Sequence, residues 1–343
     1  MTAPLARIID EPTFARLVLD YDDRDHQLSQ PYLSAMVSHR GEHLDRVIVE
    51  VGSEIVALAA VRTRRVPMLG AVAVAAGGPV VGSSGHEHRA INHQLALQAL
   101  TREYRRRGTR LHVRPPVLPT IEGWMPDSIG SDASPSPLFD QYHTMVVDLD
   151  QTEERRRQAI STQWRRHLRE SEAAGLDCLE IGIGETWQQI RPLYLETQKR
   201  KKFNAPLPLQ FWDQVFRTEQ ADRHFRGVVV QQRGRSAAGV IIGGDSAVTT
   251  FLLGASAHFA LPLRAGYLAM WAAIGLAKRA GHRYFDLGGV DREKNPGGWQ
   301  FKHGLRGRDV STPRPIVAGP DGARGRVMSL AEKATAAVRS RRR

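Results

Sequence analysis

Lys302 stands in the part of the chain whose residue types are best suited to chemistry. It follows the aromatic residues Trp299 and Phe301, and glycines stand on both sides, at Gly297-Gly298 and Gly304. Glycines let backbone approach a ligand closely, and a cation in a partly dry cleft stabilises the oxyanion of a carbonyl under attack. Lys302 alone would fit a surface lysine whose stem covers apolar groups. Its neighbours favour a catalytic cation.

Asp286 is the second candidate for a chemical role. It ends an apolar segment and is followed by Gly288 and Gly289. Its carboxylate is able to accept a hydrogen bond from an attacking amine, or to cap the turn that follows, because Asp commonly binds backbone two residues on. The sequence leaves both roles open. His303 is a conceivable base, but no neighbour in the sequence orients it.

A run of four basic residues, Lys199-Arg200-Lys201-Lys202, ends a predicted helix. Cations at this end of a helix complement its dipole and face water. The guanidinium of Arg200 is also suited to grip a diphosphate through two parallel hydrogen bonds. A solvated helix end and a phosphate contact are therefore both open.

Several classes of site are excluded. The chain has no Gly-x-Ser-x-Gly elbow, no His-Glu-x-x-His motif and no Gly-x-Gly-x-x-Gly after a strand. Its single cysteine, Cys178, rules out an intramolecular disulfide and is typical of a reducing compartment, and its leucine neighbours predict a core position. No apolar run reaches the roughly 18 residues of a membrane span, and the N-terminus lacks a secretory apolar segment. We expect a cytoplasmic protein without a metal.

Strands and helices are predicted to alternate. Strands are expected at 46–51, 55–61, 110–114, 144–149, 176–181, 227–231, 237–242, 247–253 and 283–287, and helices at 87–107, 152–174, 185–201, 209–218 and 264–280. A polar stretch over 127–137 is typical of a loop. RRGTRLHVR at 106–114 and RAGHRYFDL at 279–287 form a weak repeat, although such helix–glycine–strand connections are common. With two predicted hairpins, the pattern favours two similar α+β domains.

Three motifs of the C-terminal half occur in a specific order. LRAGYL at 263–268 leads an apolar helix, GHRYFDLGG follows at 281–289, and GGWQFKHG stands at 297–304. This order resembles the Fem family of aminoacyl-tRNA-dependent transferases, which add amino acids to peptidoglycan precursors. YHTMVVDL at 142–149 and WRRHLR at 164–169 also resemble that family, and LSQPY at 28–32 does so faintly. The resemblance is strong over about residues 142–307 and weaker before them.

The resemblance implies an α+β fold of two tandem acetyltransferase-like (GNAT-like) domains, each a mixed, mostly antiparallel sheet flanked by helices. We expect residues 1–148 to form the first domain and 149–309 the second. In the family the C-terminal segment commonly returns to the first domain, so residues 310–343 are expected there, with the end of the tail disordered.

The resemblance also implies roles for single residues. The lysine of the family's Phe-Lys motif, here Lys302, is thought to stabilise the oxyanion, with Asp286 beside it as a second catalytic candidate. Arg200, with Lys199, matches the family's contact to substrate phosphate, and Tyr267 and Phe301 are expected at the substrate. Charged tRNA is the expected cosubstrate, without a further cofactor. The acceptor is an amine of a peptidoglycan precursor or of a related peptide or small molecule.

One departure bears on the acceptor. Family members that use a nucleotide-linked muropeptide carry a lysine shortly after a Gln-Ser-x-x-Trp-like stretch, and here no lysine follows the nearest stretch, residues 29–36. A different muropeptide or a small amine is therefore an open alternative.

The charge of the chain favours phosphate-bearing partners. Its 343 residues carry 48 basic and 36 acidic side chains, a formal charge of +12. Residues 323–343 hold seven basic residues against one acid, so this tail is either an unstructured extension or a handle for polyanions, including an anionic membrane surface. Arginine clusters at 105–107, 155–157 and 165–166 are candidate tRNA contacts or solvated helix faces.

Two other functions remain open. An acyl-coenzyme A donor fits the same fold, but the pyrophosphate motif Gln/Arg-x-x-Gly-x-Gly/Ala is matched only partly, at residues 231–236 and 264–269. The first of these stretches lies in a predicted hairpin, which is the wrong context. A non-enzymatic nucleic-acid binder lacks any recognised DNA- or RNA-binding motif, and we expect no DNA partner.

Overall fold

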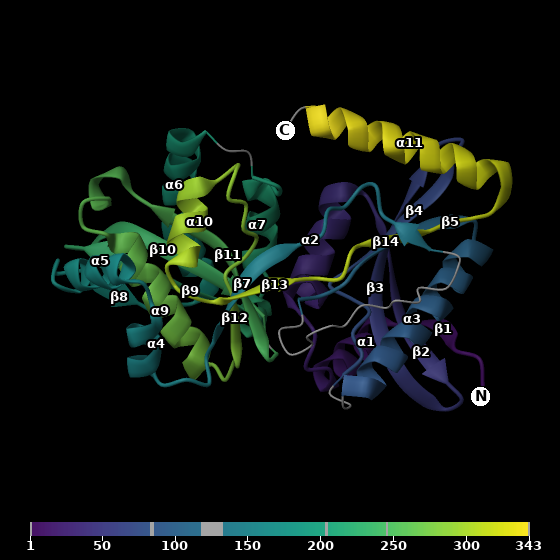
Figure 1. The fold of residues 1–343 in the computed structure, drawn as a ribbon, viewed down its shortest axis with the longest axis horizontal. Coiled ribbons are helices and arrows are strands. Elements are labelled where there is room, and N and C mark those ends of the chain that lie inside the picture. The colour runs from purple at the N-terminus through teal and green to yellow at the C-terminus, as the bar shows by residue number, and fades with distance from the viewer. Residues whose placement is uncertain (1, 83–85, 118–132, 203–204, 245, 342–343) are drawn as a thin grey trace. The chain divides into compact units, whose positions relative to one another are not determined.

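The chain folds into two compact units in a computed structural model (Figure 1), which describes residues 2–82, 86–117, 133–202, 205–244 and 246–341. The first unit comprises residues 1–28, 36–142 and 311–343, and the second comprises 29–35 and 143–310. Each contains one seven-stranded sheet within the described residues.

The first unit is built on a sheet of order β1-β2-β3-β4-β5-β14-β6. Its strands are β1 (Leu5–Ile9), β2 (His43–Val51), β3 (Glu54–Val66), β4 (Gly70–Ala76), β5 (Thr109–Arg114), β6 (Ser134–Pro135) and β14 (Ile316–Ala318). Its helices are α1 (Glu11–Leu17), the 3-10 turns η1 (Val18–Asp20) and η2 (His26–Leu28), α3 (His86–Arg106) and α11 (Gly322–Arg341), and it includes residues 36–40 of α2 (Gln30–Arg40), whose first residues belong to the second unit. The pairing is antiparallel except between β4 and β5, which run parallel.

Helix α3 supplies the core of the first unit. Leu97, Leu100 and Tyr104 are buried against small and β-branched residues of β2 to β5, because apolar residues three to four apart share one face of a helix. The Tyr104 hydroxyl donates to Asp45 at 2.8 Å, which satisfies the polar end of a buried ring.

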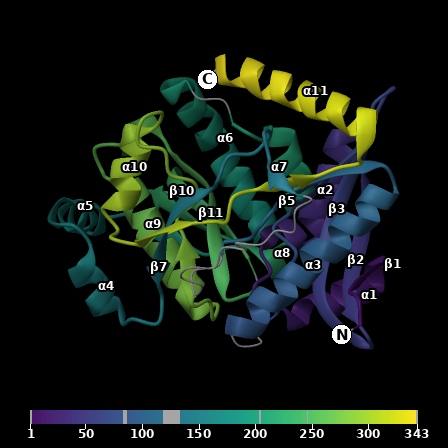
Figure 2. The ribbon, with the colours of Figure 1, turned by 45° about the vertical axis from the view of Figure 1, so that its right-hand side comes forward.

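Helix α11 covers the segment for which the sequence predicts a basic tail and no helix. Figures 1 and 2 show it beside the β5 and β14 end of the first sheet. Glu332 on this helix accepts hydrogen bonds from Arg110 Nε at 2.7 Å and pairs with His112 Nε2 at 2.8 Å. Residues to Arg341 are helical rather than extended and unstructured, and the last two lie outside the described residues.

The second unit has the sheet order β13-β7-β12-β11-β10-β9-β8. Its strands are β7 (His143–Asp148), β8 (Asp177–Leu179), β9 (Phe225–Gln232), β10 (Arg235–Gly243), β11 (Val248–Ser256), β12 (Tyr284–Asp286) and β13 (Arg308–Ser311). Its helices are α4 (Glu153–Ala159), α5 (Thr162–Glu172), α6 (Ile183–Lys201), α7 (Leu209–Phe216), α8 (Ala221–His224), the 3-10 turn η3 (His258–Ala260), α9 (Ala265–Arg279) and α10 (Pro296–His303). Helices α6 and α9 both pack on β10, whose residues from Ala237 to Gly243 are all buried.

Three features differ from the sequence prediction. The helix expected over 152–174 is two helices, because Ile160 is extended and Ser161 caps α5 through Trp164 N. The units divide at 142/143 and not at 148/149, because β7 pairs with β12 in the second sheet. Cys178 is exposed and not in the core, because β8 is the edge strand. The loop expected over 127–137 lies mostly outside the described residues, and 134–135 form β6.

Candidate active site

Two parallel strands part at the centre of the second sheet. Strands β11 and β12 pair from Val248 opposite Tyr284 to Thr250 opposite Asp286, after which β12 ends and β11 continues to Ser256. The carboxyl ends of parallel strands are common ligand sites in open sheets. The turn after β12 needs a glycine at 288, where φ is +74° and a Cβ would lie 2.8 Å from the Phe251 carbonyl oxygen.

Asp286 is buried beneath this turn, with 1% of its surface exposed. Its carboxylate accepts a hydrogen bond from Gly288 N at 2.9 Å and one from the Thr144 hydroxyl, and Thr250 Oγ1 lies 3.4 Å away. Burial raises the pKa of Asp286 to about 6, while the bonds from Thr144 and Gly288 and the charge of Lys302 oppose the rise. The cap that the sequence allowed for Asp286 is therefore present.

Lys302 lies in the last turn of α10, the helix that Asn295 caps through Gly298 N at 3.0 Å. Its Nζ donates to the Gly289 carbonyl at 2.8 Å and stands 5.3 Å from the centre of the Phe251 ring. Burial lowers the pKa of Lys302 to about 8, and Asp286 opposes the fall. An ammonium has three donors, so two of them remain for a ligand among the described contacts. Gly297 and Gly298 lie in the first turn of this helix.

An aromatic cluster of Trp164, Tyr267 and Phe301 packs α10 against α5 and α9. Trp164 Nε1 donates to the Phe301 carbonyl at 3.0 Å, and its ring lies 5.8 Å from the Phe301 ring. The Tyr267 ring is 5.0 Å from both of these rings and 4.8 Å from His167. Phe301 and Tyr267, both predicted at the substrate, are half-buried and pack against each other, and Phe301 precedes Lys302 in the chain. Burial raises the pKa of Tyr267.

Arg200 and Lys199 differ in their surroundings. Arg200 is half-buried and donates to the Ser256 carbonyl at 3.2 Å, whereas Lys199 is exposed and makes no polar contact with the described residues. Ser256 is five residues beyond Phe251 on β11, about 17 Å along an extended strand. Arg200 therefore contacts the C-terminal end of β11, whereas Lys302 lies over Phe251 near the middle of the same strand. His303 stacks on Trp299 with ring centres 4.5 Å apart, and among the described residues no acid is hydrogen-bonded to it.

Three residues that contact the candidate pair were not predicted from the sequence. Thr144 and Thr250 contact Asp286, and Phe251 contacts Lys302. Thr144 lies within the YHTMVVDL stretch, which marks a strand but not the partner of its hydroxyl. Phe251 carries no sequence signal, because its contact with Lys302 depends on the parallel pairing of β11 with β12.

Several arginines of the predicted clusters contact other groups of the protein, although Arg106 remains 71% exposed. Arg106 and Arg107 both pair with Glu103. Arg165 donates to three backbone carbonyls, and Arg157 pairs with Glu172 at 2.6 Å. Glu103 and Glu172 therefore offset part of the positive charge of these clusters.

The part of the chain that the structure describes contains neither a helix able to cross a membrane nor a cluster able to hold a metal ion. None of these helices combines the length and apolar character needed to cross a membrane. No group of three or more His, Cys, Asp or Glu residues is arranged to hold a metal ion in the same part of the chain.

Comparison with known proteins assigns the fold. The profile of the acetyltransferase (GNAT) domain family matches residues 153–303, which contain Asp286 and Lys302. The crystal structure of FemX superimposes with a TM-score of 0.79 at 11% identity, over 95% of this chain and 99% of that one. No curated protein is similar enough in sequence to match the chain.

Two further structures are similar in fold over most of the chain. L-PGS from Bacillus licheniformis gives a TM-score of 0.55 at 12% identity, over 97% of each chain. The C-terminal domain of a putative lysylphosphatidylglycerol synthetase from Agrobacterium fabrum gives 0.54 at 13% identity, over 94% of this chain and 96% of that one. The predicted resemblance to the Fem proteins and the tandem α+β fold are confirmed: residues 153–303 match the acetyltransferase (GNAT) domain family, and the chain is similar in fold to FemX.

Proposed function

We propose that the protein is an aminoacyltransferase that moves an amino acid from aminoacyl-tRNA to an amine and forms an amide bond. The observation that carries the proposal is the cation of Lys302, held over Phe251 beside the Gly288-Gly289 turn, where β11 and β12 part. The motif order, the similarity to FemX and the name of the lysylphosphatidylglycerol synthetase support tRNA as the donor.

The reaction needs alignment and charge stabilisation. The nitrogen of the acceptor amine attacks the carbonyl carbon of the aminoacyl ester, and the carbonyl electrons move to oxygen. The two free N–H donors of Lys302 stabilise this oxyanion in a half-buried site where water screens poorly. When the oxyanion collapses, the ester C–O bond breaks and the ribose hydroxyl leaves with the proton that the amine loses. An ester is higher in energy than an amide, so no nucleotide is hydrolysed.

Asp286 acts in this account as a positioning residue. Its oxygens are occupied by Gly288 N and the two threonine hydroxyls, and it is buried away from an incoming amine. Its negative charge keeps Lys302 protonated at neutral pH. Its hydrogen bond from Gly288 N fixes the turn, and the Gly289 carbonyl of that turn accepts the hydrogen bond from Lys302 Nζ.

The acceptor we propose is an amine on a cell-wall precursor, a lipid or a related peptide, with a phosphate near Arg200. Nη1 of Arg200 is engaged with the Ser256 carbonyl, so only the rest of the guanidinium is offered to a phosphate oxygen. Cytoplasmic location, contact with an anionic membrane surface and the absence of any cofactor beyond charged tRNA are part of the same proposal.

The test is transfer of a radiolabelled amino acid from charged tRNA to a panel of amine acceptors. We expect product from the wild type, abolished by pretreating the donor with ribonuclease. Lys302→Met should lose product, whereas Lys294→Met, which alters an exposed lysine paired with Asp291 nearby, should retain it. Product that survives ribonuclease treatment would remove tRNA from the account.

The second candidate is an acyltransferase that uses acyl-coenzyme A. The match of the GNAT profile and the parting of β11 and β12 favour it. Gly266 at the start of α9, however, faces the Ser256 hydroxyl, 2.9 Å from where a Cβ would lie, so this glycine serves helix–strand contact. The motif-like residues 231–236 form the β9–β10 hairpin. Calorimetry with coenzyme A separates the candidates, and tight binding would favour the second.

A further inference from the structure

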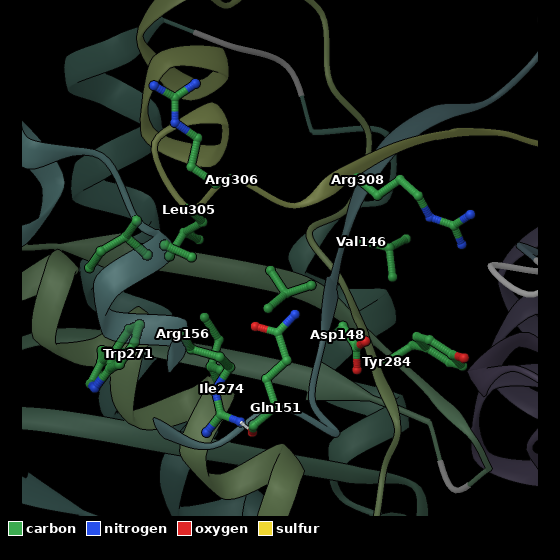
Figure 3. Close-up of a pocket in the computed structure, with 13 residues that line it drawn as sticks. Val146, Asp148, Gln151, Arg156, Trp271, Ile274, Tyr284, Leu305, Arg306 and Arg308 are labelled. Carbon is green, nitrogen blue, oxygen red and sulfur yellow. Dashed lines mark hydrogen bonds between the residues drawn. The ribbon is translucent and has the colours of Figure 1, made fainter. Parts of the chain in front are cut away.

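The buried arginine at the cavity of the second unit serves the backbone of the protein itself. Figure 3 shows this cavity, whose lining mixes polar and apolar residues and includes Arg156. Arg156 is 6% exposed and donates to the backbone carbonyls of Leu149, at 3.2 Å, and Gln151. Exposed cations without an acidic partner occur instead on the first unit, around α11 and the turn between β3 and β4.

Helix α11 carries apolar residues on two opposite faces. The face that lies against the first sheet (Figure 1) includes Met328 and Glu332, which are 3% and 6% exposed. Successive residues of a helix are rotated by about 100°, which assigns the opposite face. It consists of Ala323, Val327, Leu330, Ala334 and Val338, all of them exposed, and we call these five residues the outer stripe. A surface helix normally has polar and charged residues in this position.

Basic residues border the outer stripe on both sides. The same rotation places Arg326 and Lys333 along one side and Arg324 along the other. All three are exposed, and none forms an ion pair among the described residues. Glu332 is the single acid of α11 and faces the sheet. Asp321, just before the helix, lies 3.9 Å from an arginine of α3. The accessible charge of α11 is therefore positive.

The turn between β3 and β4 adds a second apolar group beside α11. Met68 in this turn is fully exposed and has a φ of +62°. Arg324 Nε donates to the carbonyl of the next residue, Leu69, at 3.1 Å, so the turn and the first part of α11 are in contact. A left-handed φ favours glycine over a side chain such as methionine, and no packing contact buries this one. Neither the turn nor the core therefore accounts for Met68.

Arg64 places a further cation on the side of the sheet that α11 covers. Residues opposite each other on neighbouring strands share a face of the sheet. Arg64 on β3 lies opposite Val72 on β4, and Val72 lies opposite Arg110 on β5. The Arg110 side chain reaches Glu332 of α11, so Arg64 leaves the sheet on the same face. Arg64 is exposed and forms no ion pair among the described residues.

We propose that the α11 surface, meaning the outer stripe, Met68 and the four cations beside them, docks on an anionic lipid membrane. The apolar side chains enter the boundary between headgroups and acyl chains, and the cations bind lipid phosphates. This inference rests on the membrane contact within the proposed function and names the surface that makes it. It does not depend on which acyl donor is used.

The composition of the α11 surface favours lipid over other occupants. A nucleic acid would leave the outer stripe in water, and the stripe has no aromatic side chain on which a base could stack. A second copy of the chain would place like charges opposite one another, which disfavours association. A bilayer covers apolar side chains of any shape and supplies the negative charge.

The test is sedimentation of the full-length protein with phosphatidylcholine vesicles that contain or lack phosphatidylglycerol. The partition coefficient should be at least about tenfold higher for the vesicles that contain phosphatidylglycerol, and it should fall as salt is added. Equal partition into the two kinds of vesicle, or binding to neither, overturns the proposal.

Variants of the outer stripe test the apolar contribution. Val327→Ser combined with Leu330→Ser leaves the net charge unchanged and should weaken binding to the anionic vesicles about tenfold, because less apolar surface enters the bilayer. The matched control is Leu19→Ser combined with Ile91→Ser, which alters two exposed apolar residues of the same unit outside the α11 surface. The control should bind as the wild type does. Unchanged binding of the stripe variant contradicts the assignment.

Charge variants test whether the position of the cations matters. Arg326→Gln combined with Lys333→Gln should weaken binding to the anionic vesicles about tenfold or more. Arg16→Gln combined with Arg102→Gln removes the same charge from exposed positions on α1 and α3, and it should weaken binding less than about threefold. Equal losses in the two double variants would show that net charge alone governs binding and would overturn the assignment to α11.

Two further measurements separate this inference from its alternatives. Transfer to a water-soluble amine should proceed in the stripe variant as in the wild type, because α11 is remote in the chain from Lys302 and Asp286 and contacts neither among the described residues. Wild-type protein that binds anionic vesicles but transfers no amino acid would support membrane docking and contradict the transferase alone. A dimer in sedimentation velocity that the stripe variant dissociates would assign the stripe to a second copy and overturn the proposal.

Discussion

Lys302 and Asp286 each make a hydrogen bond to the same turn. Asp286 accepts a hydrogen bond from Gly288 N at 2.9 Å, and Lys302 Nζ donates to the Gly289 carbonyl at 2.8 Å. The acid is buried, and the ammonium keeps two donors for a ligand. Because the carboxylate supports the charge on the lysine, the two residues act as one unit, although they lie on different elements.

The pH dependence of kcat/KM should reflect both groups. The active form has Asp286 ionised and Lys302 protonated, and their pKa values are about 6 and about 8. After correction for ionisation of the acceptor amine, kcat/KM should therefore rise with pH through about 6 and fall through about 8. Initial rates between pH 5 and about 9.5 measure it. A rate that keeps rising through pH 9 would mean that neutral Lys302 is the active form.

Asp286→Asn should change stability in a pH-dependent direction. The pKa of Asp286 is raised in the folded state from 3.8 to about 6, so the folded protein binds this proton more tightly than the unfolded chain. Its contribution to stability is therefore largest below pH 3.8 and declines as pH rises to about 6. The urea denaturation midpoint of Asp286→Asn, minus that of the wild type, should therefore increase between pH 3.8 and about 6 and stay constant at higher pH. A constant difference would contradict the raised pKa.

Gly288→Ala should be strongly destabilising. It combines the left-handed φ of +74° with a Cβ placed 2.8 Å from the Phe251 carbonyl oxygen, which we expect to cost about 3 kcal/mol of unfolding free energy. Gly281→Ala is the control, because its φ is +88° but no atom lies within 4 Å of its Cβ. It should cost about 1 kcal/mol. Equal losses in the two variants would show that the turn has room to yield.

Glu332→Gln should loosen α11 from the first unit. Burial opposes ionisation of Glu332, but the hydrogen bonds from His112 and Arg110 outweigh it and lower its pKa. Loss of the charge leaves Arg110 buried without its partner, at a cost of about 3 kcal/mol. An acid whose pKa is lower in the folded protein than in the unfolded chain contributes to stability at pH values above its unfolded pKa. The loss of unfolding free energy in Glu332→Gln, relative to the wild type, should therefore shrink as pH falls below about 4.5. Lys333→Gln, an exposed neighbour, should change little in urea unfolding.

Sequence reasoning succeeded where a local signal decides the structure. The periodicity of 87–107 and 264–280 gives α3 and α9 within a residue or so, because an apolar stripe needs no distant partner. The motif order around Asp286 and Lys302 likewise selected the two groups that meet at the turn.

The sequence does not predict the structure where a single helix cap, or a contact between residues far apart in the chain, determines it. Ser161 divides one charged stretch into α4 and α5, and Asn295 converts a glycine-rich stretch into α10. The anchoring of α11 depends on Arg110 and His112, more than 200 residues away in the chain. The Lys302–Phe251 contact depends on the parallel pairing of two strands separated by α9.

The most direct test of the central claim is single-turnover amide formation from preformed aminoacyl-tRNA by wild type and Lys302→Met. If Lys302 stabilises the oxyanion, the variant should form amide about 10²- to 10³-fold more slowly, with acceptor affinity nearly unchanged. Lys294→Met should react at the wild-type rate. A Lys302→Met protein that forms amide as fast as the wild type would contradict the account.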